Sequence, residues 1–369
     1  MINAYVRLFH MMKNIKDDID REIKGFVEDI RTRYHLDDVS PLLFDGIKDF
    51  LERDGKRIRP IIYMLAYKGY TRRPDFQYSR LLRSSLSLEL LHDFLLIHDD
   101  VIDKSDLRRG KPTLHKYFEA KCKTSDPAAG ASLAIVAGDV VFAMAMDAFL
   151  AMDEKPYLKE RALKYFVEYV ALTGAGEFID VTNGIKDLDK VKEEEVFFTY
   201  TMKTAKYTFE APLVMGAILG GADDHEVKRL SRLGTLLGQA FQLQDDMLDL
   251  FSNEKEIGKP VGSDLLEGKK TLLVWQAYNK MDDKAKTAFK KLFEKEKKQK
   301  ADVIKLKKMI KMSGAADYCL NKLWMFMGEA EQIALKLNMT EDARKDIYDM
   351  IRSFFSKSKA LADAVQKFK

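Results

Sequence analysis

The sequence is poor in the residues that break helices or cross-link a chain. Its 369 residues include only 8 prolines, 20 glycines and 2 cysteines. Because Cys122 and Cys319 lack the Cys-x-x-Cys or Cys/His spacing of a zinc site, we expect free thiols rather than a disulfide or a zinc centre. The 62 basic and 58 acidic residues leave a net charge of only +4, so no nucleic-acid partner is expected.

Targeting and membrane signals are also missing. The first residues form no basic segment followed by an apolar run and a small-residue cleavage site, so secretion is not expected. The apolar stretch at residues 128–152 is interrupted by Asp139 and Asp147, and we interpret it as short of the roughly 20 apolar residues that a span needs. We therefore predict a cytoplasmic protein without an integral membrane segment.

Several catalytic signatures are absent. The sequence contains no Gly-x-x-x-x-Gly-Lys-Ser/Thr or Gly-x-Gly-x-x-Gly element, so an anion would not be cradled as in nucleotide-binding folds. It also lacks Gly-x-Ser-x-Gly and His-Glu-x-x-His. Hydrolase chemistry of these kinds is therefore disfavoured.

Apolar residues instead recur at helical spacing almost throughout. One such run consists of Leu81, Leu82, Leu86, Leu90, Leu91 and Leu95. The pattern predicts an all-α fold of long helices around one core. Short connectors, without a repeat or a flexible linker, favour a single domain over residues 1–369. The lysine-rich segment 284–311 is interpreted as a solvated helical surface, with a membrane-surface site as the alternative.

An acidic cluster follows the apolar helix that this run predicts. In Asp99-Asp100-Val-Ile-Asp103 the first and last aspartates are four residues apart, so their carboxylates project from one helix face. Two like charges so placed repel each other unless a cation lies between them. A hard divalent metal ion would relieve the repulsion.

A second cluster repeats this spacing. Asp245-Asp246-Met-Leu-Asp249 again follows an apolar helical stretch. Two matching clusters indicate facing walls of a cleft. Carboxylates without cysteine or histidine ligands select Mg²⁺, which keeps several waters and takes phosphate oxygens from a substrate. The sequence therefore predicts a phosphorylated substrate.

Basic residues that could bind such a substrate follow both clusters. Arg108 and Arg109 come after the first, and Lys259 and Lys269 come after the second. Arginine forks bind phosphate in bidentate fashion, and lysines act as point charges. A diphosphate bridged by metal ions fits this arrangement.

With these motifs the sequence resembles the trans-prenyl diphosphate synthases, the family of farnesyl and geranylgeranyl diphosphate synthases. The resemblance covers roughly residues 45–275 and rests on motifs in a fixed order. Besides the two aspartate clusters, with Arg108-Arg109-Gly110 after the first and Phe241-Gln242 before the second, they are Gly55-Lys56-Arg57-Ile58-Arg59-Pro60, Lys203-Thr204, and Gly258-Lys259 through Asp264 to Lys269-Lys270-Thr271.

The resemblance implies a bundle of antiparallel helices around a deep cavity, usually as a homodimer. It implies a prenyltransferase of isoprenoid biosynthesis that joins isopentenyl diphosphate to an allylic diphosphate (dimethylallyl, geranyl or farnesyl). Mg²⁺ would be bound first by Asp99, Asp103 and Asp245. Asp100, Asp249 and Asp264 would act beside them or through water.

Two basic sites are also implied by the resemblance. The allylic diphosphate would contact Arg108, Lys203, Lys259 and Lys269. The diphosphate of isopentenyl diphosphate would contact Lys56, Arg59, His92 and Arg109. Such cations would stabilise the leaving pyrophosphate, and the released pyrophosphate could take the proton lost after addition.

One helical segment, residues 196–219, contains Lys203 and Thr204. A threonine hydroxyl can bond a preceding carbonyl and bend a helix, which would expose carbonyl dipoles. By resemblance, this backbone and Gln242 face the carbocation. The family often has glutamine at the position of Glu177, a departure that leaves the diphosphate motifs complete.

Product length is expected to depend on the helix before Asp99. The family commonly sets it with bulky residues four and five positions before the motif, which here are Leu95 and Phe94. On a helix that rises ~1.5 Å per residue, Phe94 lies ~7.5 Å and Leu91 ~12 Å below Asp99. One aromatic residue, at the fifth position, resembles the archaeal-type geranylgeranyl synthases and predicts a C20 product, with C15 or C25 as alternatives.

Two other classes of protein are alternatives to a synthase. A class I terpene cyclase usually has an Asn/Asp, Ser/Thr, Glu triad as its second metal site, and Asp245 to Asp249 does not match it. A non-catalytic synthase-like subunit is expected to have lost ligands from one cluster. Both clusters are complete in this sequence.

Overall fold

The computed structural model describes residues 2–123, 125–251 and 262–366. Helices dominate these ranges, which confirms the predicted all-α fold. By its internal contacts the chain divides into two compact units, Met1–Leu163 with Val214–Ala222 and Lys164–Leu213 with Asp223–Lys369. Each unit is assembled from two separate stretches of sequence. This division does not test the single functional domain over residues 1–369, which stays a prediction.

The first unit is built around the pair α5 and α7. These two helices make the most extensive contact in the described chain, and α6 and α4 pack against them. The elements of this unit are α1 (Ile2–Tyr34), α2 (Leu36–Val39), α3 (Pro41–Leu51), α4 (Ile58–Tyr70), α5 (Tyr78–Ile102), β1 (Leu107–Arg108), β2 (Lys111–Pro112), α6 (Leu114–Cys122), α7 (Pro127–Leu150), the start of α8 (Pro156–Ile185) and most of α10 (Ala211–Leu219).

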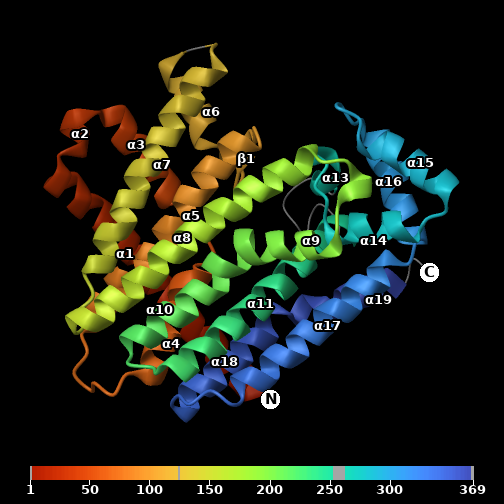
Figure 1. Cartoon of the computed structure of the whole chain (residues 1–369). Coiled ribbons are helices and arrows are strands. Elements are labelled where there is room, and N and C mark those ends of the chain that lie inside the picture. Colours follow the sequence, from red (N-terminus) through yellow and green to blue (C-terminus); the bar gives the residue numbers. More distant parts are fainter. Residues whose placement is uncertain (1, 124, 252–261, 367–369) are drawn as a thin grey trace. The chain divides into compact units, whose positions relative to one another are not determined.

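The second unit is built around α11, which packs against η2 and α17 (Figure 1). Its elements are the rest of α8, η1 (Leu188–Lys190), α9 (Glu193–Thr199), η2 (Tyr200–Glu210), α11 (Asp224–Phe251), α13 (Ser263–Glu267), α14 (Leu272–Lys280), α15 (Asp283–Phe293), α16 (Lys300–Met312), α17 (Ala315–Ala334), α18 (Glu341–Phe354) and α19 (Ser356–Gln366).

Several helices begin at a capping side chain. Ser40 accepts a hydrogen bond from the backbone amide of Leu43, and Asp126 accepts one from that of Ala128. In both cases a proline is the next residue, where its fixed φ suits the first helical turn. Gly220 and Gly221 lie between α10 and α11, whereas Gly258-Lys259-Pro260 lies outside the described residues.

Helix α7 departs from one expectation. By length and composition it could span a membrane, which corrects the prediction that residues 128–152 are too interrupted. Although this stretch contains Asp139 and Asp147, its mean hydropathy is still 2.0, high enough for a span. The same helix packs on α5 and α6, and one such helix is weak evidence for a membrane span because buried core helices share this composition.

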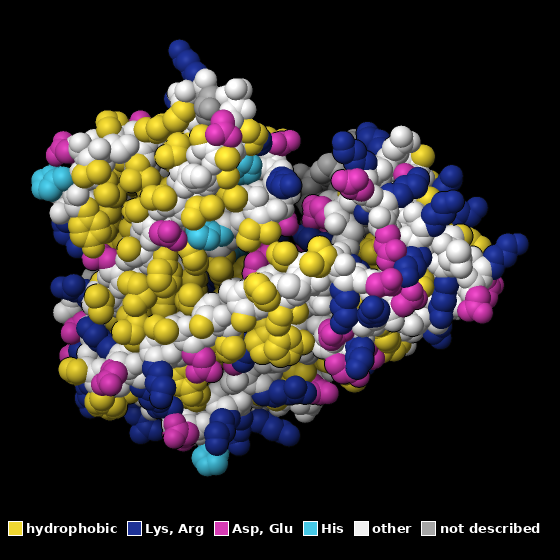
Figure 2. All heavy atoms as spheres, turned by 45° about the horizontal axis from the view of Figure 1, so that its top comes forward, with side chains coloured by type: hydrophobic (Ala, Val, Ile, Leu, Met, Phe, Trp, Pro, Cys, Tyr) yellow, Lys and Arg dark blue, Asp and Glu magenta, His cyan; other side chains and the backbone are white. Residues whose placement is uncertain are grey.

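The lysine-rich segment forms the helices α15 and α16. Phe289, Phe293, Leu306 and Ile310 are buried inside the unit. The lysines lie mainly on the outer side, and Figure 2 shows basic side chains gathered over this region, on the right of the view. This is the amphipathic pattern that the solvated interpretation predicts.

Helix η2 is a π-helix of 11 residues, wider than an α-helix. Glycines on α11 allow it to approach closely: a Cβ added at Gly238 would lie 2.2 Å from the Cβ of Ala205. On the same face Glu210 is buried and accepts hydrogen bonds from Tyr169, Ser231 and Thr235. The π-helix is thus held by close backbone packing and by one satisfied buried carboxylate.

We predict that Gly238→Ala destabilises the protein, by roughly 1–3 kcal/mol, because the added methyl group overlaps Ala205 and forces the backbones apart. Gly174→Ala is the matched control, since Gly174 is an exposed helical glycine with nothing within 4 Å of an added Cβ. The control should gain about 0.5–1 kcal/mol of helix propensity. Urea unfolding of both variants measures the difference, and equal stabilities would contradict this packing.

Candidate active site

The first aspartate cluster occupies the C-terminal end of α5. Asp99 and Asp100 lie in its last turn and Asp103 is the C-cap. The amide of Asp103 donates to the carbonyl of Asp99 over 2.8 Å, so the helical spacing that the sequence predicts is present. The Asp99 side chain is partly exposed, whereas that of Asp100 is buried.

Arg108 neutralises this cluster. Its Nε donates to Asp100 Oδ1 over 2.9 Å and its Nη2 to Asp99 Oδ2 over 3.3 Å. Burial raises the pKa of Asp100, and the adjacent guanidinium opposes that rise. In the free chain Arg108 is therefore paired with the aspartates, and its predicted contact with a diphosphate requires it to share or exchange these partners.

A short hairpin positions the neighbouring arginine. Strands β1 and β2 pair Leu107 with Pro112 and Arg108 with Lys111. The two turn residues, Arg109 and Gly110, have φ of 55° and 74°, the pattern of a type I′ turn. Arg109 therefore takes a left-handed backbone conformation that an ordinary loop residue avoids.

The predicted isopentenyl diphosphate residues gather in the first unit. Burial lowers the pKa of His92 well below its usual value, and the charges of Arg59 and Arg109 lower it further. A Cβ at Gly55 would lie 3.5 Å from the Cζ of Arg109, so this glycine leaves room for the guanidinium. Lys56, the next residue, is exposed. His92 is thus a neutral imidazole among cations.

The second aspartate cluster lies at the C-terminal end of α11. Asp245 is exposed, while Asp246 is 4% exposed and Asp249 2%. Asp246 accepts hydrogen bonds from the Tyr200 hydroxyl and from Gln242 Nε2. Burial raises the pKa of Asp246 well above its usual value, and the charge of Asp264 raises it further. Asp245 is the member of this cluster most open to a solvent-borne ligand.

Asp249 organises the start of α13. Its Oδ1 accepts from the Ser263 hydroxyl over 2.8 Å, and its backbone carbonyl accepts from the amide of Gly262 over 3.0 Å. Asp264 follows directly, and its carbonyl accepts from the amide of Lys269 over 2.8 Å. Asp249 therefore fixes the position of Asp264, and its own role toward a metal ion stays a prediction. Lys259 lies outside the described residues.

Lys269 and Lys270 differ in their contacts. Lys269 Nζ forms an exposed ion pair with Glu267 at 2.7 Å. Lys270 Nζ instead donates to the backbone carbonyls of Asn183 and Gly184, over 2.7 and 2.8 Å. Lys270 therefore fastens this segment to the end of α8, and Lys269 keeps the more accessible charge.

Lys203 lies in η2 between two carboxylates of α8. Its Nζ is 2.8 Å from Glu177 Oε2 and 2.7 Å from Asp180 Oδ2. The helix is distorted here, as predicted, but the predicted cause is wrong. Thr204 donates to Gln242 Oε1 over 2.8 Å, and the bond to a preceding carbonyl is made by Thr201, which donates to Phe197 O.

Tyr200 is a residue that the sequence interpretation missed. Its hydroxyl donates to Asp246 and accepts from the amide of Leu272, which is the first residue of α14. Gln242 links this pair to Thr204, because it accepts from the threonine and donates to Asp246. The only sequence signal for a role of Tyr200 is its position three residues before Lys203.

The predicted chain-length residues lie along α5. The ring of Phe94 is 5.2 Å from that of Phe142 on α7 and 4.6 Å from that of His98. Leu95 is partly exposed, and Leu91 is fully buried in the core. A Cβ at Gly138 would lie 2.6 Å from the His98 ring. The ring cluster of Phe94, His98 and Phe142 thus joins α5 to α7. Phe142 is a member that the sequence interpretation missed.

The donors of both clusters suit a hard cation, since all are carboxylate oxygens. Within the described ranges, no three His, Cys, Asp or Glu side chains come together as a preformed metal cage. Mg²⁺ commonly uses one or two carboxylates and completes its shell with water and substrate phosphates. The residues therefore fit this ion together with a diphosphate rather than alone.

Residues 40–310 match the sequence model of the polyprenyl synthetase family. The chain belongs to the polyprenyl synthetase family. It is a trans-prenyl diphosphate synthase, a prenyltransferase of the short-chain type. The matched range extends beyond the residues 45–275 over which the motifs carry the resemblance.

Curated relatives and solved structures agree with this assignment. The synthase is 35% identical over 262 residues to geranylgeranyl diphosphate synthase of Sulfolobus acidocaldarius, covering 70% of this chain and 73% of that one. It is 32% identical over 274 residues to a short chain isoprenyl diphosphate synthase of Methanocaldococcus jannaschii, covering 74% and 75%. The crystal structure of geranylgeranyl pyrophosphate synthetase from Pyrococcus horikoshii matches with a TM-score of 0.80 at 31% identity, covering 95% and 98%.

A further structure supports the fold alone. Geranylgeranyl pyrophosphate synthase from Corynebacterium glutamicum, complexed with isoprenyl diphosphate and magnesium, matches with a TM-score of 0.84 at 24% identity, covering 93% of this chain and 98% of that one. These matches confirm the predicted isoprenoid synthase fold. They also extend it into the terminal regions, where the motifs carry little signal.

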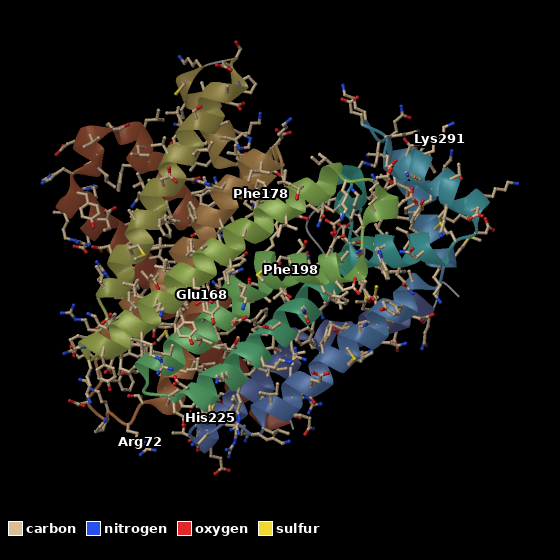
Figure 3. All side chains as sticks on the ribbon, viewed as in Figure 1. Arg72, Glu168, Phe178, Phe198, His225 and Lys291 are labelled. Atoms are coloured by element: carbon tan, nitrogen blue, oxygen red, sulfur yellow. The ribbon has the colours of Figure 1, made fainter. Side chains whose placement is uncertain are left out.

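We predict that Glu177→Gln strengthens the binding of inorganic pyrophosphate in the presence of Mg²⁺. Lys203 would lose one of its two neutralising carboxylates, and a gain of about twofold to fivefold is what a partly exposed ion pair allows. Glu168→Gln is the matched control, because Glu168 is exposed on the same helix (Figure 3) and removes the same charge. Isothermal titration at fixed ionic strength compares them, and equal affinities would contradict the role of Glu177.

Proposed function

We propose that the synthase condenses isopentenyl diphosphate with allylic diphosphates, with Mg²⁺ as cofactor and geranylgeranyl diphosphate as its main product. The observation that carries this proposal is that each of the two complete aspartate clusters lies at a helix end, the first paired with Arg108 and the second followed by Lys269 on the segment that Asp249 anchors. Farnesyl or geranylfarnesyl diphosphate is the alternative product. The similarity to the geranylgeranyl diphosphate synthases of Sulfolobus and Pyrococcus supports the C20 product.

The predicted ligands fit the cofactor. Asp99, Asp103 and Asp245 would hold Mg²⁺ together with diphosphate oxygens, because they are the carboxylates with exposed or partly exposed positions. When bound, the ion neutralises charge on the leaving pyrophosphate. Asp100 and Asp249 are buried and fix Arg108 and Asp264, so their contribution is to position the groups around the ion.

The chain's own residues prepare the ionisation of the allylic substrate. Arg108 and Lys203 are each held by two carboxylates, and an arriving diphosphate becomes a third anion for each. Positive groups fixed in place before the reaction stabilise the charge that develops on the leaving group without further reorganisation. Thr204 and Gln242 are locked to each other and to Asp246, so their dipoles keep one orientation toward the predicted carbocation.

The homodimer stays a proposal that rests on the family resemblance and on an apolar strip of α7. Leu133, Ile135, Val136 and Leu150 are exposed there, at 39%, 41%, 58% and 58%, and exposed apolar patches of this kind commonly mark interfaces. Light scattering of the purified protein tests it. A monomer at micromolar concentration would contradict it.

Asp99→Ala and Asp245→Ala are each predicted to reduce condensation by at least about 10²-fold, the scale on which removal of one electrostatic stabiliser lowers a rate. The fold should persist, since neither side chain is buried. Incorporation of labelled isopentenyl diphosphate with Mg²⁺ and each allylic primer is the measurement. Asp106→Ala is the control, because its side chain is 80% exposed and outside both motifs. Near-normal activity of either variant at saturating Mg²⁺ would refute the ligand assignment.

We predict that Phe94→Ala and Phe142→Ala each shift the product toward longer chains, because each removes one ring from the cluster between α5 and α7 and leaves space there. Leu95→Phe should shorten the product. Mass analysis of the products from farnesyl diphosphate measures chain length, and Phe9→Ala, whose ring is 65% exposed on α1, is the control. An unchanged product in both ring variants would show that other residues limit chain length.

A further inference from the structure

Two buried acids on α5 have no part in the mechanism above. Glu89 and Asp93 are 2% and 1% exposed and lie one helical turn apart, so their carboxylates occupy the same helix face. Carboxylates are rarely buried without compensating charge, because desolvation of an ion costs several kcal/mol. The cations that compensate them belong to the segment predicted to bind isopentenyl diphosphate.

Glu89 is matched by an arginine that makes no predicted substrate contact. Arg57 is 2% exposed and its Nη1 donates to Glu89 Oε1 over 2.8 Å. Its Nε donates to Asp20 of α1 over 2.8 Å, and its Nη2 to the carbonyl of Arg53 over 2.7 Å. All three guanidinium nitrogens are engaged, and none of these hydrogen bonds goes to Asp93.

Asp93 is matched less well. It forms an ion pair with Arg109, whose Nη2 lies 3.9 Å from Asp93 Oδ1, too far for a hydrogen bond. Among the described residues, Asp93 Oδ1 has no hydrogen-bond partner. Arg109 itself is 24% exposed, so the ion pair joins a buried acid to a guanidinium that solvent reaches from the other side.

The charged groups around Asp93 come from three parts of the unit. On its own helix they are Glu89 and the neutral His92, and from the segment leading into α4 they are Arg57 and Arg59. The hairpin between β1 and β2 contributes Arg109. Burial raises the pKa of Asp93 to about 7, with Glu89 raising it and the arginines lowering it. The carboxyl group is therefore poised between its two protonation states near neutral pH.

We propose that Asp93 is a positioning residue that holds the Arg109 guanidinium in place before substrate binds, and that it takes up a proton when the diphosphate of isopentenyl diphosphate replaces it as counter-ion. The proposal rests on the proposed function, because it assigns Arg109 to that diphosphate. In the free protein Asp93 and Arg109 attract each other. A diphosphate on Arg109 adds negative charge near Asp93, which favours the neutral acid.

The sign of the pH dependence follows from linkage. Below the pKa of free Asp93 the acid is already protonated, and binding takes up no proton. Between the pKa of the free form and the higher pKa of the bound form, binding takes up a proton, so affinity falls as pH rises. A single coupled proton limits the slope to about tenfold per pH unit. Ionisation of the diphosphate itself works in the opposite direction and affects wild type and variants alike.

The test is isothermal titration of isopentenyl diphosphate into the full-length protein without an allylic substrate, so that no turnover occurs. Titrations from pH 6.5 to 8.5, in buffers of different ionisation enthalpy, measure both affinity and proton uptake. We expect wild type to take up protons near pH 7.5 and to lose affinity several-fold by pH 8.5. Asp93→Asn, close to the same shape, should take up none, and its affinity should fall less than twofold.

A second variant changes the charge beside Asp93 and leaves Asp93 itself in place. Glu89→Gln removes the repulsion that disfavours the Asp93 carboxylate, so proton uptake should shift to lower pH. The control Asp147→Asn removes an acid paired with Arg33 on the same unit and should behave as wild type. Absence of binding in wild type would overturn both this proposal and the proposed function. Binding in which wild type takes up no more protons than Asp93→Asn would overturn this proposal alone.

Discussion

The buried guanidinium of Arg57 is the interaction on which the charged part of the first unit depends. It joins Asp20 of α1 to Glu89 of α5 and binds the carbonyl of Arg53, and its backbone takes the left-handed conformation with φ of 50°. Removal of one partner from a buried ion pair costs about 3–5 kcal/mol, because the other charge is left uncompensated. This network fixes the turn that presents Gly55 and Lys56 and starts α4 before Arg59.

The same principle governs the residues that are predicted to meet substrate. Arg108 is held by Asp99 and Asp100, Lys203 by Glu177 and Asp180, and Arg109 by Asp93. Each cation thus has carboxylate partners before a diphosphate arrives. The affinity for a diphosphate is then a difference between two sets of anionic partners, and the protein's own acids keep long cationic side chains ordered in the free state.

The sequence predicted the helical fold and the helix-end position of both aspartate clusters, because each depends on residues that are close in sequence. It also predicted a distortion near Lys203, but not its cause, because the partners of η2 lie on other helices. It could not predict the partners of those residues. Thr204 bonds Gln242 on another helix, and Phe94 meets Phe142 on α7, and neither pairing leaves a local pattern. The prediction that residues 128–152 are too interrupted for a membrane span was wrong for a different reason. Two aspartates do not offset the apolar character of the rest of α7.

The two aspartate clusters share one spacing but not one electrostatic state. In each, the first aspartate is the more open, and the second is buried as the helix geometry requires. Asp100 of the first cluster is paired with a cation, Arg108, whereas Asp246 of the second is held by Tyr200 and Gln242, which are uncharged. Burial and the charge of Asp264 raise the pKa of Asp246 well above its usual value, and the hydrogen bonds from Tyr200 and Gln242 oppose that rise without supplying a positive charge. Clusters of the same spacing therefore lie in different surroundings, a guanidinium at the end of α5 and uncharged donors at the end of α11.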